Sequence, residues 1–213
     1  MSPPLSRPIP RFIADSAQEK LPYGRWAERL RGEFEASCAP LTEEAGTVLD
    51  SETVEWFPER AWGGRVYVPV TGRGESEGEN PIEYFGHVSF VRPNEDEPRE
   101  LRASADFTDV VAEANPEWQI DLNDAVIGAW RTDGGRAGEV TLVWGVPLVR
   151  GAVVATAELD REVVDQAPID DGRFTLIAVD AVKGMGDDDY LEIQLWDRRV
   201  NQLAAESLYD QPE

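Results

Sequence analysis

The sequence predicts a mainly β fold of about ten mostly antiparallel strands in a sandwich or barrel, with one N-terminal amphipathic helix. Apolar residues recur at alternate positions between residues 53 and 208, which is the period of a strand with one buried face. Turn residues separate these runs at intervals of roughly 8–12 residues, as they do in sandwiches and barrels. Strands do not alternate with helical segments, so a doubly wound parallel sheet is not expected.

One helix is predicted in the segment before Pro40, because apolar residues recur there at every fourth position. The apolar stripe consists of Trp26, Leu30, Phe34 and Cys38. We expect the helix to begin near Tyr23 and to end by Ala39, since a proline disfavours helical backbone in the residue before it. Cys38 lies at the end of the stripe and is interpreted as a buried, unreactive thiol.

Ten segments have the alternating pattern of strands. They are residues 53–57, 65–70, 82–90, 101–107, 125–131, 139–149, 152–158, 174–182, 190–196 and 202–208. Residues 125–131 and 139–149 are predicted to form a hairpin, because a tight-turn sequence, Asp-Gly-Gly, lies between them. Residues 190–196 and 202–208 are predicted to form a second hairpin, although the last segment also fits a helix. Pro69 suggests that its strand is an edge strand or carries a bulge.

Residues 1–22 are rich in proline and lack periodicity, so we predict an extended arm followed by a single β-rich domain of residues 23–213. The segments 72–81 and 93–100 are charged and contain no apolar residue. We expect them to be loop insertions rather than domain linkers, because strand-like sequence resumes directly after each. A short helix is predicted within Thr108–Asn115, ahead of a proline.

The charge balance excludes some classes of partner. The chain has 42 acidic and 20 basic residues and a formal net charge of −22. Such a surface repels the phosphates of nucleic acids and anionic lipid headgroups, so neither a nucleic acid nor a membrane is an expected partner. The basic residues are almost all arginine, which fits a high genomic GC content or adaptation to a high-salt cytoplasm. We favour the first explanation.

The sequence is typical of a soluble cytoplasmic protein. A single cysteine allows no intrachain disulfide and no cluster of thiolate metal ligands within one chain. No apolar run approaches the roughly 20 residues that span a bilayer. Prolines occupy the N-terminal segment where a signal peptide needs an apolar core.

His87 is the only histidine, so a zinc site with several histidines cannot form within one chain. Strand parity places it with Glu83 and Ser89, opposite the apolar face of its strand. Glu83 lies about 13 Å away along an extended strand and is not expected to be a direct partner. We interpret His87 as a residue on a half-exposed sheet face. The alternative is a catalytic general base that faces a cavity.

Three consecutive carboxylates, Asp187, Asp188 and Asp189, offer oxygen ligands for a hard cation such as Ca²⁺. Their spacing does not match an EF-hand loop, and adjacent aspartates in a short loop point in different directions. We interpret them as a solvated hairpin tip, with weak Ca²⁺ binding as the alternative. No other cofactor is expected.

Aromatic residues are densest between positions 56 and 67, where Trp56, Phe57, Trp62 and Tyr67 lie close in sequence. The usual role of such rings is core packing or closure of a barrel end. The alternative is an aromatic platform for a sugar or small apolar ligand, which makes Trp56, Trp62 and Tyr67 candidate ligand-binding residues.

Familiar catalytic motifs do not occur: the sequence has no phosphate-binding loop, no dinucleotide-binding glycine pattern and no nucleophile elbow. A pair of catalytic carboxylates cannot be selected from 42 candidates by sequence. Glu192 lies between Leu191 and Ile193 and is expected to point outward.

Three functions remain open. The one we favour is a non-enzymatic binding module for a basic protein partner or for a small ligand in a sandwich or barrel pocket. The first alternative is a carboxylate- or metal-assisted enzyme with its cleft near His87. The second alternative is a mimic of nucleic acid that blocks DNA-binding proteins, although the acidic residues are spread over many loops rather than aligned.

Overall fold

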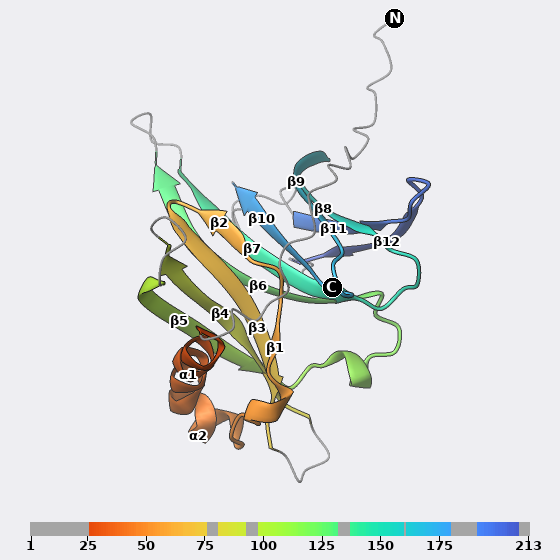
Figure 1. Ribbon diagram of the computed structural model, residues 1–213. Helices are drawn as coiled ribbons and strands as arrows, with labels where there is room; N and C mark the ends of the chain where they lie inside the picture. The colour runs from red at the N-terminus through yellow and green to blue at the C-terminus, as the bar shows by residue number, and fades with distance from the viewer. Residues whose placement is uncertain are drawn as a thin grey trace, which may run out of the picture.

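A computed structural model describes most of the chain. The described residues are 26–75, 81–92, 98–131, 137–159, 161–179 and 191–208. They form twelve strands in three antiparallel sheets and one main helix, α1 (Ala27–Cys38), on the N-terminal side (Figure 1). The mainly β prediction is therefore confirmed, and the architecture is a layered sandwich rather than a closed barrel. The predicted arm, residues 1–22, lies outside the described residues, and the single-domain assignment stays a prediction.

Sheet I contains five strands in the order β1-β3-β4-β5, and β2 also pairs with β3. Its strands are β1 (Glu55–Trp56), β2 (Arg60–Trp62), β3 (Arg65–Arg73), β4 (Glu83–Val91) and β5 (Arg99–Thr108). Pro69 was predicted to mark an edge or a bulge. It does not lie on an edge strand, and its register to β4 is regular, but on the other side the pairing shifts by one residue between β1 and β2, next to Pro69, as in a bulge. The Pro69 carbonyl accepts a hydrogen bond from the Phe57 N–H at 3.0 Å. The proline nitrogen points to the same side, where β1 has ended and β2 has not begun, so no ladder bond is lost.

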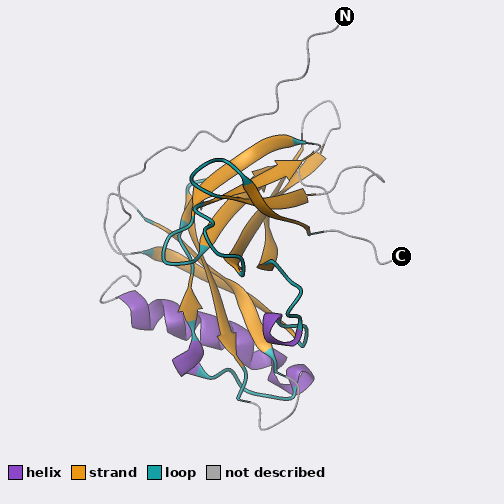
Figure 2. Ribbon diagram, turned by 90° about the vertical axis from the view of Figure 1, so that its right-hand side faces the viewer, coloured by secondary structure: helices purple, strands orange, loops and turns teal. Residues whose placement is uncertain are grey.

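Helix α1 covers one face of sheet I, across β4 and β5 (Figure 2). The predicted stripe is confirmed, since Leu30, Phe34 and Cys38 are buried and Trp26 is half-buried. They pack against the even-numbered face of β3 and β4, which includes Val68 and Tyr84. The helix is followed by the short elements η2 (Ala39–Leu41), α2 (Thr42–Ala45) and η3 (Ser51–Thr53).

Two further sheets complete the sandwich. Sheet II has the order β10-β7-β6, and sheet III has the order β12-β11-β8-β9. Their strands are β6 (Ile120–Arg131), β7 (Ala137–Pro147), β8 (Val154–Leu159), β9 (Glu162–Pro168), β10 (Phe174–Val179), β11 (Leu191–Trp196) and β12 (Gln202–Ser207). Both predicted hairpins are confirmed as β6–β7 and β11–β12, and the last segment is a strand.

Strands β7 and β10 of sheet II are buried on both faces. Trp144 and Ile177 face sheet I and pack with Phe57 and Tyr67 in one apolar cluster. Neighbouring residues of the same strands face sheet III and join a second cluster, to which Val143 belongs. This double burial explains why β7 and β10 have near-continuous apolar sequences rather than a strict alternation.

Carboxylates bridge sheets II and III where the two sheets lack a backbone ladder. Asp165 of β9 accepts a hydrogen bond from the Ile177 N–H of β10 at 2.8 Å. Glu206 of β12 accepts bonds from the N–H groups of Gln119 at 2.9 Å and Ile120 at 3.2 Å, at the start of β6. These side chains satisfy donors of edge strands without a continuous ladder, so the two sheets approach each other along both edges and remain separate.

Several predictions on local structure need correction. The predicted helix within Thr108–Asn115 is only a single 3₁₀ turn, η4 (Ala112–Ala114). Strands β2 and β9 were not predicted. Glu192 is half-buried rather than fully outward, and it accepts a hydrogen bond from the buried Gln194.

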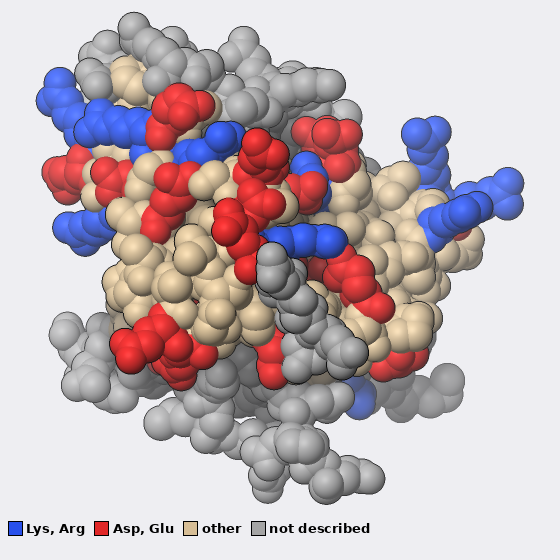
Figure 3. Space-filling model, turned by 90° about the horizontal axis from the view of Figure 1, so that it is seen from below, with Lys and Arg blue, Asp and Glu red and all other residues tan. Residues whose placement is uncertain are grey.

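The described surface carries many charges. On the face seen from below, acidic side chains lie interleaved with basic ones (Figure 3). No helix among the described residues has the length and apolar character that crossing a membrane requires.

Candidate functional site

A cleft of about 590 Å³ opens at one end of the interface between sheets I and II. Its walls come from β1, β3 and β4 on one side and from β6 and the end of β7 on the other, with η4 at the rim. The volume lies within the range of roughly 300–1,000 Å³ that is common for small-molecule sites. The cleft is therefore large enough for a small ligand.

Strand parity explains which side chains reach the cleft. On β4, Glu83 shares its face with Phe85 and His87, and this face is turned towards sheet II. On β6, Asp121 and Asn123 are in phase with Ala125, which packs in the cluster between sheets I and II. On both β4 and β6, the inward-facing positions are thus polar at the end of the strand that lines the cleft and apolar at the next position towards the core.

Glu83, Asp121 and Asn123 form the polar centre of the cleft. The amide Nδ2 of Asn123 donates a hydrogen bond to Oε1 of Glu83 at 3.3 Å. Burial, and after it the nearby charge of Asp121, raise the pKa of Glu83 to about 7. The Asn123 hydrogen bond and Arg73 oppose this rise only in part. Glu83 is therefore close to half protonated at neutral pH.

Asp121 lies between carboxylates of two other sheets. Burial raises its pKa, and the charge of Glu206 adds to the effect. Glu206 itself accepts two backbone hydrogen bonds, from the N–H groups of Gln119 and Ile120. Glu83 and Asp121 are both half-buried, and their raised pKa values indicate that their surroundings do not fully compensate their negative charge.

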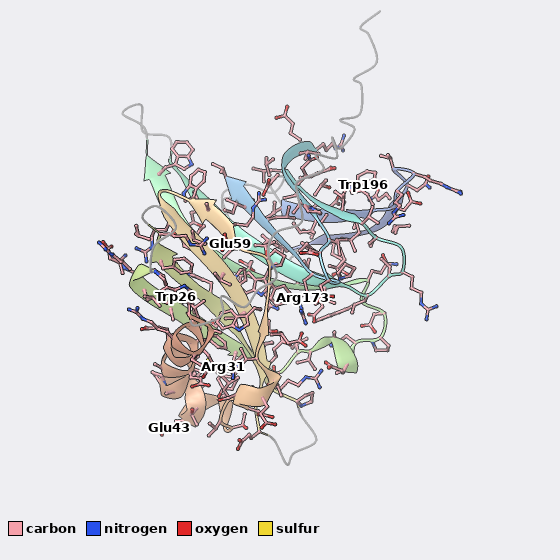
Figure 4. All side chains as sticks on the ribbon, viewed as in Figure 1. Trp26, Arg31, Glu43, Glu59, Arg173 and Trp196 are labelled. Carbon is pink, nitrogen blue, oxygen red and sulfur yellow. The ribbon has the colours of Figure 1, made fainter. Side chains whose placement is uncertain are left out.

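Two arginines form ion pairs at the cleft. Arg73 pairs with Glu113, and both side chains are more than half exposed. Arg173 pairs with Glu55, with 2.6 Å between Nη2 and Oε2. The Arg173 guanidinium carbon lies 5.8 Å from the centre of the Phe57 ring, beside β1 (Figure 4). These pairs engage Arg73 and Arg173 with Glu113 and Glu55, and Arg73 offsets the negative charge at Glu83 only in part.

His87 lies outside this cleft. The prediction of a half-exposed position is wrong, because sheet II covers its face of sheet I and leaves the residue 8% exposed. Its ring lies 5.6 Å from that of Tyr67. Burial lowers the pKa of His87 to about 4, and the charge of Arg65 contributes. The imidazole is neutral at physiological pH, and its Nδ1 has no hydrogen-bond partner in the described part of the chain.

The candidate aromatic residues do not form one platform. Tyr67 is a core residue between sheets I and II, whereas Trp56 packs on the opposite, helix-covered face of sheet I. Trp62 is 38% exposed at the end of β2. The core-packing interpretation therefore holds for Tyr67, and the three rings do not converge.

The candidate metal ligands Asp187, Asp188 and Asp189 lie outside the described residues. Within the described ranges, no group of three or more His, Cys, Asp or Glu side chains is arranged to hold a metal ion. Cys38 is buried as predicted, and burial raises the pKa of its thiol to about 12.

Sequence reasoning placed Glu83 on the correct face of its strand but did not connect it with Asp121 and Asn123. A signal was present in the sequence. The predicted strand 125–131 begins five residues earlier in the structure, at Ile120, and this extension puts both polar residues in phase with Ala125. Two polar residues at inward positions indicate a polar cavity or a buried network.

The fold and the cleft define a layered, antiparallel β sandwich with a carboxyl-rich cleft between two of its sheets. Comparisons with protein-family models, with curated proteins and with solved structures found no match to this chain.

Proposed function

We propose that the protein is a non-enzymatic binding module that holds a small molecule in the cleft between sheets I and II. The observation that carries this proposal is the cleft itself, in which half-buried polar groups lie next to apolar walls. Sites of this composition bury the apolar part of a ligand and use a few polar groups to orient it. A cytoplasmic location belongs to the same proposal.

The walls of the cleft support binding of a ligand that has both an apolar and a polar part. Phe57 and Val146 supply buried and half-buried apolar surface, and Leu148 at the mouth is 43% exposed. Glu83 and Asn123 are joined by a hydrogen bond across the two sheets, so the polar centre has a fixed geometry. A preorganised site loses less entropy on binding than a flexible one.

Fragment screening by ligand-observed NMR tests this proposal with the full chain. Leu148→Trp is expected to fill the mouth of the cleft, and Val164→Trp on β9 is the matched control at another exposed apolar position. We expect some fragments to lose binding to Leu148→Trp and to keep binding to Val164→Trp. If no fragment distinguishes the two variants, the cleft is not a ligand site.

A second candidate function is an enzyme that uses Glu83 as a general acid or base. The pKa of Glu83, raised to about 7 by burial, lies near the pH at which such a group is most effective. A panel of chromogenic esters and glycosides at pH 5–8 tests this candidate. Turnover that depends on Glu83, and that Glu83→Gln removes, would favour the enzyme over the binding module.

A further inference from the structure

We infer that the ligand of this cleft is a small organic cation, with an ammonium or guanidinium group on a short apolar stem. This inference rests on the proposed function, because it names the ligand class of the same cleft. Three properties of the cleft point to this class: its uncompensated charge, its hydrogen-bonding character and its apolar walls.

The charge of the cleft is unbalanced at its centre. Arg73 and Arg173 are engaged by Glu113 and Glu55. Glu83 and Asp121 have no ion-pair partner within the ranges that the structure describes. Half-buried carboxylates without an ion-pair partner destabilise the folded state, and a cation bound between them reduces this cost.

The hydrogen-bonding groups of the centre are mainly acceptors. The carboxylates of Glu83 and Asp121 accept hydrogen bonds when ionised. Asn123 donates one N–H of its Nδ2 group to Glu83, which leaves the second N–H as a donor and Oδ1 as an acceptor. The complementary ligand must therefore donate several hydrogen bonds from one end, as ammonium and guanidinium groups do.

The apolar walls distinguish an organic cation from a bare metal ion. Phe57, Val146 and Leu148 line the same cleft as the carboxyl pair. A hydrated metal ion gains nothing from these side chains, whereas a short aliphatic stem loses its contact with water against them. The cleft thus matches a molecule with one cationic end and one apolar end.

Three probes of nearly equal shape but different charge distinguish a preference for cations from binding of any molecule that fits the cleft. They are butylguanidinium, its neutral isostere butylurea, and the anion valerate. Each is titrated into the full chain at pH 8 and roughly 0.15 M salt, where long-range attraction is screened beyond about 8 Å. Binding is followed in ¹H–¹⁵N NMR spectra at the backbone N–H groups of Gly72, Val146 and Leu148.

We expect butylguanidinium to bind at least about tenfold more tightly than butylurea, and valerate not to bind. Glu83→Gln combined with Asp121→Asn should remove this preference, whereas Glu162→Gln, on exposed β9, should leave it unchanged. Leu148→Arg places a guanidinium in the mouth of the cleft and should weaken butylguanidinium binding as an internal competitor. This second variant keeps the test decisive if the double variant does not fold.

Several outcomes would overturn the inference. Tighter binding of butylurea or valerate at the same N–H groups would mean that the cleft takes another ligand class, while the proposed function stands. Equal butylguanidinium binding to the wild type and the double variant would show diffuse attraction to the net charge. Displacement of butylguanidinium by micromolar CaCl₂ would identify a metal site. Absence of shifts with all three probes overturns the inference, and the fragment screen then decides the proposed function separately.

Discussion

Removal of the Glu83 charge should stabilise the protein at high pH. Burial and the charge of Asp121 raise the pKa of Glu83 from its ordinary value of 4.5 to about 7. Between these values the folded protein retains a proton that the unfolded chain releases, so the free energy of unfolding falls as the pH rises. One pH unit corresponds to about 1.4 kcal/mol, and the full cost above pH 8 is therefore about 3 kcal/mol.

Glu83→Gln removes the ionisable group and keeps an oxygen that accepts the Asn123 hydrogen bond. We expect the stability of this variant relative to the wild type to increase by about 2 kcal/mol between pH 5 and pH 8. The charged groups that act on the pKa of Glu83 are Asp121, Arg73 and Glu55, and this substitution leaves them in place.

Urea denaturation followed by tryptophan fluorescence measures this difference at each pH, with the slope on urea as a check on two-state unfolding. Glu162→Gln on β9 is the matched control, because it removes one negative charge from an exposed strand position. This control corrects for the stabilisation that follows from removing any one negative charge from a chain of net charge −22. If the free energy of unfolding depends on pH in the same way for Glu83→Gln and Glu162→Gln, the reasoning about burial at Glu83 is refuted.

Four other predictions concern packing and burial. Gly86→Ala should destabilise the protein by about 3 kcal/mol or more, because a Cβ there would lie 2.0 Å from the Ser104 carbonyl oxygen. Gly32→Ala in α1 should stabilise the protein by about 1 kcal/mol, because a Cβ there meets no atom within 4 Å. Urea denaturation of the two glycine variants measures whether each free energy of unfolding falls or rises as expected. Tyr84→Phe should cost about 1–2 kcal/mol in the same assay, because the buried hydroxyl donates to the Thr47 carbonyl at 2.6 Å. Cys38 should not react with a thiol reagent at pH 8 until urea unfolds the protein, since burial raises its pKa to about 12, and prompt labelling of the native protein would contradict its position.

The alternation of apolar residues was sufficient to predict the fold class and the faces of the main strands. The face of Tyr84 and Val88 packs against α1 as its parity indicates. The opposite face, with His87, was expected to be half exposed. Its burial depends on sheet II, and a periodic pattern does not report which layer covers a polar face.

Short or partly polar strands were missed for a related reason. β2 has three residues and β9 contains Glu162, Asp165 and Gln166, so neither has a clear apolar alternation. Their positions are determined by pairing with β3 and β8 and by the Asp165 carboxylate, which are tertiary interactions. The pairing of Glu83 with Asp121 is also tertiary, since these residues lie far apart in sequence.

The most direct test of the account is the side-chain carboxyl resonance of Glu83 in ¹³C NMR spectra of the full chain. We predict that this carboxyl titrates with a pKa near 7, because it is buried beside Asp121, and that saturation with butylguanidinium lowers the value by about one pH unit or more. A Glu83 carboxyl that titrates near 4.5, and whose pKa does not change when butylguanidinium is added, would contradict the account.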